Sequence, residues 1–267
     1  MTTEAVNPKT ASISDVPVPE ILRMINEEDR SVPGIVAASI PQIAILVDKA
    51  VNAVQNGGRI IYCGCGTSGR LAVADAAECP PTYGLSPEVF SAVIAGGPGA
   101  IVNASEGCED STEKGREAFR EKQITQKDLV IGISASGKAP FVLAFMKEAR
   151  NTGCCTAAIV NNQDTSMAEL ADITVAACTG PEVIKGSTRM KAGTAQKLIL
   201  NMFSTAVCIR LGCVYRNLMV NLKVSNDKLK KRAVDMVTEI TGLDAEKAEL
   251  CLKKSNWSVK EAISSLR

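Results

Sequence analysis

The sequence RIIYCGCGTSGR, residues 59–70, joins an apolar run to a glycine-rich segment and decides how the chain folds. The run at residues 59–63 has the length and composition of a buried strand. The three glycines that follow permit positive φ angles and close backbone contacts. Thr67 and Ser68 add hydroxyls beside Gly66, and the free N–H groups at a helix start attract anions. We therefore predict a strand, a tight turn and a helix start. At this helix start, Gly66, Thr67 and Ser68 are predicted to bind an anion such as a phosphate.

The same segment also matches the GxGxxG pattern of dinucleotide-binding loops, which leaves a second interpretation open. Such folds place an acidic residue at the end of the next strand, where it accepts a ribose hydroxyl. The next apolar run, residues 89–95, ends without one, and the adjacent hydroxyls of Thr67 and Ser68 suit a terminal phosphate better. A plain strand-to-helix turn without a ligand is the third interpretation.

Short apolar runs and helical segments alternate from this point towards the C-terminus. The predicted strands are residues 59–63, 89–95, 129–133, 156–160 and 173–177. The predicted helices are residues 71–77, 111–122, 139–150 and 188–211. This alternation is typical of an α/β fold with a parallel sheet, and uniformly apolar strands indicate a sheet covered on both faces. Right-handed crossovers then bring the loops that follow the strands to one edge, where ligands bind in such folds.

Three regions differ in pattern, and we expect them to be separate structural units. Residues 1–58 are predicted to be a helical segment that packs on the core. Residues 59–226 carry the alternating pattern. Residues 227–267 are charged and lack a strand signal, so they predict a small helical bundle. Its helices are expected at residues 234–240, 245–253 and 258–266.

A second candidate anion site follows the third predicted strand. Ser134 and Ser136 supply hydroxyls, Gly137 allows a tight turn, and Lys138 adds a positive charge at a helix start. A serine-rich helix cap without a ligand would have the same pattern. Because two such loops follow two parallel strands, a shared binding role explains them better than two unrelated caps.

A third candidate lies at residues 182–197, which lead into the longest predicted helix. Ser187, Thr188 and Lys191 place hydroxyls and a cation at the mouth of this helix. We predict that they also bind the substrate. For Lys191 taken alone, a solvated surface charge is the alternative.

Two carboxylates lie near these loops in the sequence. Pro80 disfavours a helical conformation in the residue before it, so we predict that the first helix ends near Glu78 and directs this side chain at the cleft. Glu109 follows the second predicted strand within EGCED, residues 106–110. For both residues the alternative is an ordinary surface or helix-start charge.

Composition excludes several classes of function. The net charge of +1 and the aromatic content of 3% give no basis for nucleic-acid or membrane binding, so neither partner is expected. The absence of histidine excludes histidine catalysis and histidine-ligated metals. The 10 cysteines lack zinc-site spacing, so we expect reduced thiols and no metal site. Neither a signal peptide nor a membrane span is indicated, and the expected location is cytoplasmic.

Several longer motifs are distinctive. They are INEED (25–29), IYCGCGTSGRL (61–71), DAAECPPTYG (75–84), EGCED (106–110), GPEV (180–183) and GSTRMKAGTAQK (186–197). Together they resemble the N-acetylmuramic acid 6-phosphate etherase family of the sugar-isomerase-domain superfamily. The resemblance implies a three-layer α/β/α sandwich with a mainly parallel sheet, acting as a homodimer with the site near the subunit interface. It also implies a sugar-phosphate substrate and no cofactor.

The resemblance further implies cleavage of a D-lactyl ether, giving N-acetylglucosamine 6-phosphate and D-lactate, in the recycling of cell-wall amino sugars. The family's two catalytic carboxylates fall on Glu78 and Glu109. We assign Glu78 to the departing lactate oxygen and Glu109 to the C2 proton, because elimination needs one acid and one base. A non-catalytic sugar-phosphate regulator and a phosphosugar isomerase are the alternatives. The presence of both carboxylates favours the lyase.

Two features depart from the usual sequence of the family. Lys138 and Ala139 replace an arginine and a threonine, which removes a bidentate guanidinium and a hydroxyl and is expected to affect substrate affinity. The C-terminal bundle is shorter than usual and also resembles ubiquitin-associated three-helix modules. We expect it to pack against the core.

Overall fold

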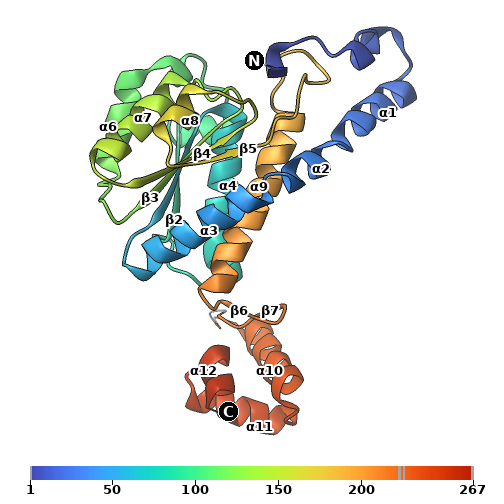
Figure 1. Cartoon of the computed structure of the whole chain (residues 1–267). Helices are drawn as coiled ribbons and strands as arrows, with labels where there is room; N and C mark the ends of the chain where they lie inside the picture. Colours follow the sequence, from blue (N-terminus) through green and yellow to red (C-terminus); the bar gives the residue numbers. More distant parts are fainter. Residues whose placement is uncertain (1, 222–223, 225, 266–267) are drawn as a thin grey trace.

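A computed structural model of the chain describes residues 2–221, 224 and 226–265. Its centre is a five-stranded parallel sheet in the order β2-β1-β3-β4-β5 (Figure 1). The strands are β1 (Ile60–Gly64), β2 (Phe90–Ile94), β3 (Leu129–Ser134), β4 (Cys155–Val160) and β5 (Ile173–Ala176). The short strands β6 (Val214–Tyr215) and β7 (Leu218–Met219) form an antiparallel pair after the last helix of the sheet domain. The predicted α/β fold with a parallel sheet is confirmed.

Helices connect the strands and cover both faces of the sheet. They are α1 (Val18–Asp29), α2 (Val32–Ala37), α3 (Ile40–Gln55), α4 (Gly66–Tyr83), α5 (Gly99–Val102), α6 (Thr112–Glu121), α7 (Pro140–Asn151), α8 (Ser166–Leu170), α9 (Lys191–Arg210), α10 (Asp227–Thr241), α11 (Ala245–Lys254) and α12 (Val259–Ser264). Short 3₁₀ turns are η1 (Thr2–Glu4), η2 (Pro8–Thr10), η3 (Ile13–Asp15) and η4 (Cys108–Asp110).

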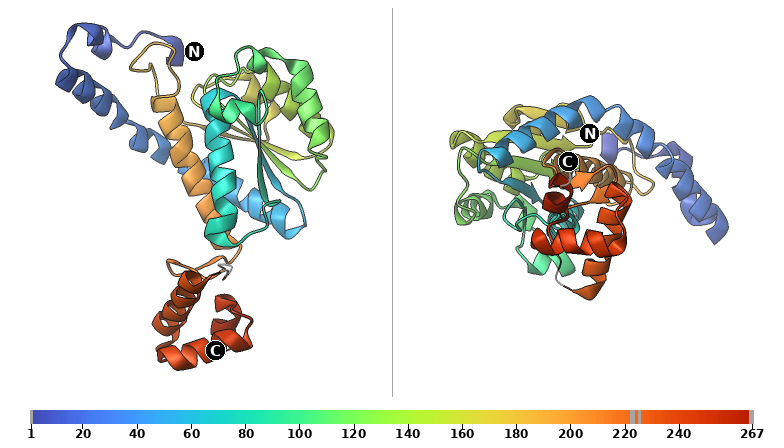
Figure 2. Two further views of the ribbon diagram at one scale, coloured as in Figure 1. Left: turned by 180° about the vertical axis from the view of Figure 1, so that it is seen from behind. Right: turned by 90° about the horizontal axis from the view of Figure 1, so that it is seen from below.

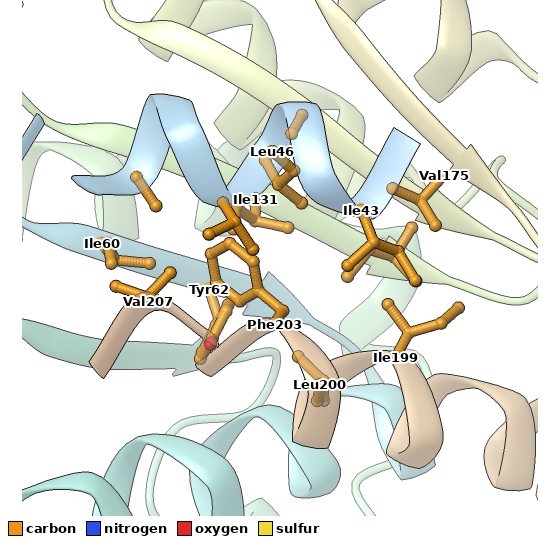
Figure 3. Close-up of a cluster of buried hydrophobic side chains, with 14 of the residues drawn as sticks. Ile43, Leu46, Ile60, Tyr62, Ile131, Val175, Ile199, Leu200, Phe203 and Val207 are labelled. Carbon is orange, nitrogen blue, oxygen red and sulfur yellow. The ribbon is translucent and has the colours of Figure 1, made fainter. Parts of the chain in front are cut away.

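The alternation of side chains along each strand produces two hydrophobic layers. Ile60 and Tyr62 of β1 face the cluster under α2, α3, α4 and α9, whereas Ile61 and Cys63 face the cluster under α6, α7 and α8. In the first cluster the rings of Tyr62 and Phe203 lie edge to face, 6.3 Å apart (Figure 3). These two layers and the sheet between them form the predicted three-layer sandwich.

The N-terminal segment divides into two parts. Val32, Val36 and Leu46 are fully buried, so α2 and α3 belong to the core. The turns η1–η3 and α1 lie to one side, next to the start of α9 (Figures 1 and 2). No single helix of the described ranges is long and apolar enough to cross a membrane. The segments 18–37 and 40–55, which are bent relative to each other, are together long and apolar enough, by length and composition alone.

The C-terminal bundle, α10–α12, buries a hydrophobic cluster of its own and extends away from the end of α9 (Figures 1 and 2). The expectation that it packs against the core is therefore wrong. The segment before it remains joined to the sheet domain, because the Asn221 side chain donates to the Tyr83 carbonyl at 2.9 Å. Leu266, the last residue of the third predicted helix, lies outside the described residues.

Helix α4 is longer than predicted. It continues to Tyr83, so the prediction that it ends near Glu78 is wrong. Pro80 and Pro81 lie inside the helix, although each lacks an N–H for the carbonyl four residues earlier and its ring crowds that carbonyl. The helix ends instead at Gly84, which has a φ of +65° and donates to the Pro80 carbonyl at 2.9 Å.

Candidate active site

The first anion loop lies at the start of α4, where glycines determine the backbone path. Gly66 has a φ of +52°. A Cβ on Gly69 would lie 2.8 Å from the Gly64 oxygen, closer than real Cβ atoms come, so the turn requires glycine there. Cys65 caps the helix without a side-chain hydrogen bond. The first N–H groups of α4 therefore lack a side-chain cap and lie at the positive end of the helix, as an anion site requires.

The three residues predicted to bind the anion differ in accessibility. Gly66 is exposed, Thr67 is half-buried and Ser68 is buried. Thr67 also faces the first turn of α9, because a Cβ on Gly193 would lie 3.3 Å from the Thr67 methyl and 3.6 Å from the Thr188 oxygen. The first and third predicted loops therefore adjoin.

The second loop, residues 134–138, follows β3, which pairs directly with β1, so the first two loops lie side by side at the carboxyl edge. Ser134 Oγ accepts from the Gly137 N–H and Ser136 Oγ from the Lys138 N–H, both at 3.2 Å. Gly137 has a φ of +64°, and a Cβ there would lie 2.5 Å from the Cβ of Thr165. The loop is thus tightly turned, and it presents an exposed Lys138.

The N-terminus of α9 is capped by a carboxylate of the same chain. Glu182 is fully buried and accepts from the N–H groups of Lys191, at 2.8 Å, and Ala192, at 2.9 Å. Burial raises the pKa of Glu182, and the two N–H groups offset part of that rise. The N-terminus of α9 is therefore already paired with an anion, unlike that of α4.

Lys191, predicted to bind substrate, is engaged elsewhere. Its Nζ lies 2.6 Å from a Glu28 carboxylate oxygen, and the two side chains are only 4% and 8% exposed. Burial alone would raise the pKa of Glu28, but hydrogen bonds from Lys191, Asn7 and Lys9 outweigh it and hold the pKa below its usual value. Ser187 and Thr188 remain half-buried at the helix mouth.

Glu109 is exposed in η4 and lies within electrostatic range of Cys65, the residue before α4. Burial raises the pKa of Cys65 to about 12, with further contributions from Glu109, Cys108 and Asp110. Cys65 therefore stays a neutral thiol.

Glu78 lies far along the same helix. It is exposed and comes twelve positions after Gly66, which corresponds to roughly 18 Å along the helix axis. Within one chain the structure therefore brings Glu109 to the anion loops and does not bring Glu78 there.

Sequence patterns missed several buried polar residues. Asn161 and Asn162 follow β4 at the carboxyl edge and are almost fully buried. The only feature of the sequence that could have indicated these two residues is their position directly after a predicted strand. Asp75 is buried on α4 and accepts from Tyr62 Oη and Ser204 Oγ, each at 2.9 Å. No group of three His, Cys, Asp or Glu side chains in the described ranges could hold a metal ion.

A cavity of about 810 Å³ opens along the outer edge of β2, and Ser105, Cys108 and Lys114 are among the residues that line it. Cys108 is the residue before Glu109, so the cavity borders the segment that carries this carboxylate. The three predicted anion loops do not contribute to its lining. The cavity is therefore separate from the loops predicted to bind the anion.

Comparison with known proteins identifies matching families along most of the chain. The profile of the glucokinase regulatory protein N-terminal SIS domain matches residues 42–150, and the SIS domain profile matches residues 113–206. The profile of the C-terminal lid domain of glucokinase regulatory protein matches residues 216–267. The N-acetylmuramic acid 6-phosphate etherases of Salmonella dublin and Salmonella typhimurium are each 46% identical over 263 residues, covering 98% of this chain and 89% of the relative.

Solved structures with the same fold are more distant in sequence. Escherichia coli CFT073 c3406 in complex with A5P has a TM-score of 0.55 at 19% identity, covering 75% of this chain and 96% of that one. A phosphoheptose isomerase from Francisella tularensis has a TM-score of 0.54 at 17% identity, with coverages of 70% and 98%. These likenesses confirm the sugar-isomerase fold.

Proposed function

The chain belongs to the N-acetylmuramic acid 6-phosphate etherase family, and we propose that its site cleaves the D-lactyl ether of that sugar phosphate by elimination followed by water addition. The observation that carries the proposal is the arrangement at the carboxyl edge. There, two anion loops follow the paired strands β1 and β3, and Glu109 lies beside the first loop. All 10 cysteines are free thiols, which supports a cytoplasmic location for this reaction. The role that we propose for it is the recycling of cell-wall amino sugars.

The loops hold the phosphate and the carboxylates move the protons. In the open-chain sugar the C1 aldehyde acidifies the C2 proton, which Glu109 removes. The electron pair forms a C2=C3 double bond, the C3–O bond breaks, and Glu78 gives its proton to the departing lactate oxygen. Glu78 then takes a proton from water as the water oxygen bonds to C3, and Glu109 returns its proton to C2. Both carboxylates regain their starting protonation states, and no cofactor is required.

The position of Glu78 supports a homodimer. This carboxylate is exposed and lies about three helical turns from the loops of its own chain. Elimination requires both carboxylates around one sugar ring. We therefore place Glu78 in the site of a second copy, whose loops and Glu109 complete it, so that a two-fold dimer has two equivalent sites.

The proposed activity is tested by incubating the protein with N-acetylmuramic acid 6-phosphate in H₂¹⁸O. We expect D-lactate release and one ¹⁸O atom at C3 of the N-acetylglucosamine 6-phosphate formed. The unphosphorylated sugar is the matched control, and its turnover should be far slower because the anion loops have nothing to hold. Tight binding of the phosphosugar without any lactate release would instead support the regulator alternative and reject the lyase.

A further inference from the structure

The N-terminal turn η1 is anchored to a buried asparagine beside the second anion loop. Asn162 Oδ1 accepts from the Thr2 N–H at 2.8 Å and from Thr2 Oγ1 at 3.1 Å. Asn162 Nδ2 donates to Thr3 Oγ1 at 3.0 Å. Thr3 is fully buried by these contacts. Two residues near one end of the sequence are thus fixed to the carboxyl end of β4, about 160 positions away.

The same asparagine holds the second anion loop. Asn162 Nδ2 also donates to the carbonyl of Ala135 at 2.9 Å, and the Asn161 N–H donates to that carbonyl at 3.1 Å. Ala135 stands between Ser134 and Ser136, whose hydroxyls organise the loop. The amide of Asn162 therefore joins η1 on one side to the middle of the loop on the other.

A second set of contacts ties the same N-terminal segment to the mouth of α9. Thr10 Oγ1 donates to the Val183 carbonyl at 2.7 Å. Glu28 pairs with Lys191 at the first residue of α9. The segment before α2 thus contacts two of the three predicted loops, and its contact with Asn162 reaches the loop at residues 134–138.

We propose that Asn162 is a positioning residue, which transmits the N-terminal anchor to the Ala135 carbonyl and so fixes residues 134–138 for the phosphate of the substrate. This inference rests on the proposed function, because it assigns the loop to a phosphosugar. A side chain that fixes only a binding loop supports ground state and transition state alike. Its loss should therefore raise KM and leave kcat nearly unchanged.

The test compares three variants with the wild type. Asn162→Ala removes every contact of the amide, and Asn162→Asp keeps an acceptor for Thr2 but turns a carboxylate oxygen towards Ala135. Thr3→Val removes only the contact on the N-terminal side and serves as a milder second probe. We expect KM to rise about tenfold in both Asn162 variants, as the loss of a buried hydrogen bond implies. For Thr3→Val we expect a smaller rise, and kcat should stay within about twofold throughout.

The matched control is Thr156→Val, at the other end of β4. Its hydroxyl makes buried hydrogen bonds to the Leu170 carbonyl and to Asp172, remote from the loops. It should destabilise the fold without changing KM. Hydrogen exchange provides a readout independent of catalysis, since amides of residues 134–138 should exchange faster in Asn162→Ala and not in Thr156→Val.

Unchanged KM and unchanged exchange in Asn162→Ala would overturn the inference while the etherase activity stands. An equal rise of KM in Thr156→Val would also overturn it, because the effect would then be general destabilisation. If the wild type releases no lactate, the proposed function fails. The inference is then decided by the dissociation constant for N-acetylglucosamine 6-phosphate. A rise of about tenfold in Asn162→Ala supports the inference, and an unchanged constant rejects it.

Discussion

Glu78 and Gly66 belong to one uninterrupted helix, α4, and lie roughly 18 Å apart along its axis. Gly66 belongs to the loop proposed to bind the phosphate, and Glu78 is the proposed acid. Within one chain, these two proposed parts of the site are therefore far apart. This relationship leads us to place each active site between two chains, and it makes the roles of Glu78 and Glu109 separable by experiment.

Replacing each of the two carboxylates should block a different step of the reaction. Glu78→Gln and Glu109→Gln should each reduce lactate release by about 10²–10⁴-fold or more, because each removes one proton transfer. In D₂O, Glu78→Gln should still exchange the C2 proton of the substrate, since its base is intact, whereas Glu109→Gln should not. Proton NMR of the substrate measures this exchange. Glu106→Gln, an exposed acid near Glu109, is the control and should keep full activity.

Gly69→Ala should damage both the fold and substrate binding. A Cβ at this position would lie 2.6 Å from the Ile94 side chain and 2.8 Å from the Gly64 oxygen, so the start of α4 must move away from β1. We expect a loss of about 1–3 kcal/mol in the free energy of unfolding, as overpacking costs, and a higher KM. Gly34→Ala, where a Cβ meets no atom within 4 Å, is the matched control. Equal stability of the two variants would contradict the close packing of this turn.

The ion pair between Glu28 and Lys191 should stabilise the fold as a unit. Lys191→Met leaves a buried carboxylate with fewer partners and should cost about 3–5 kcal/mol in urea unfolding. Glu28→Met combined with Lys191→Met should cost clearly less than the sum of the single changes, because neither charge is then left alone. Strict additivity would mean that the two side chains do not interact in solution.

Asp128 should make stability depend on acid pH. It accepts from the Arg59 side chain, the Arg59 N–H and the Thr125 N–H. Burial alone would raise its pKa, but these hydrogen bonds outweigh it and lower the pKa below the usual 3.8. A carboxyl with a lowered folded-state pKa stabilises fully above its unfolded pKa and loses this contribution as the pH falls through the folded value.

The difference in free energy of unfolding between wild type and Asp128→Asn should therefore be largest above about pH 5 and shrink below pH ~4. Chemical unfolding at a series of pH values measures it. A difference that stays constant from pH 3 to pH 7 would contradict the role assigned to the Asp128 carboxylate.

Local patterns were sufficient to predict the sheet and the turn that follows its first strand. The apolar run at residues 59–63 and the glycines after it have few alternative uses, and the structure has a strand, a tight turn and a helix there. The end of α4 was mispredicted because Pro80 and Pro81 lie inside the helix, against the usual preference of proline to end one. Local sequence preference was overridden by the packing of α4 against α9.

Partners far apart in sequence could not be predicted from spacing. Lys191 had the pattern of a substrate-binding or surface lysine, yet its partner Glu28 lies 163 positions earlier. Asn162 had no motif around it, and its role depends on Thr2, Thr3 and Ala135 converging on one amide. Such contacts depend on the tertiary fold, which brings the N-terminal segment to the carboxyl edge of the sheet.

The most direct test of the shared site is complementation between two inactive variants, Glu78→Gln and Glu109→Gln, unfolded together and refolded as a mixture. If each site takes Glu109 from one chain and Glu78 from the other, a mixed dimer has one intact site and one doubly altered site. With random pairing, lactate release from N-acetylmuramic acid 6-phosphate should recover to about a quarter of the wild-type rate. No recovery in a mixture shown to contain mixed dimers would contradict the shared site and place both carboxylates in one chain.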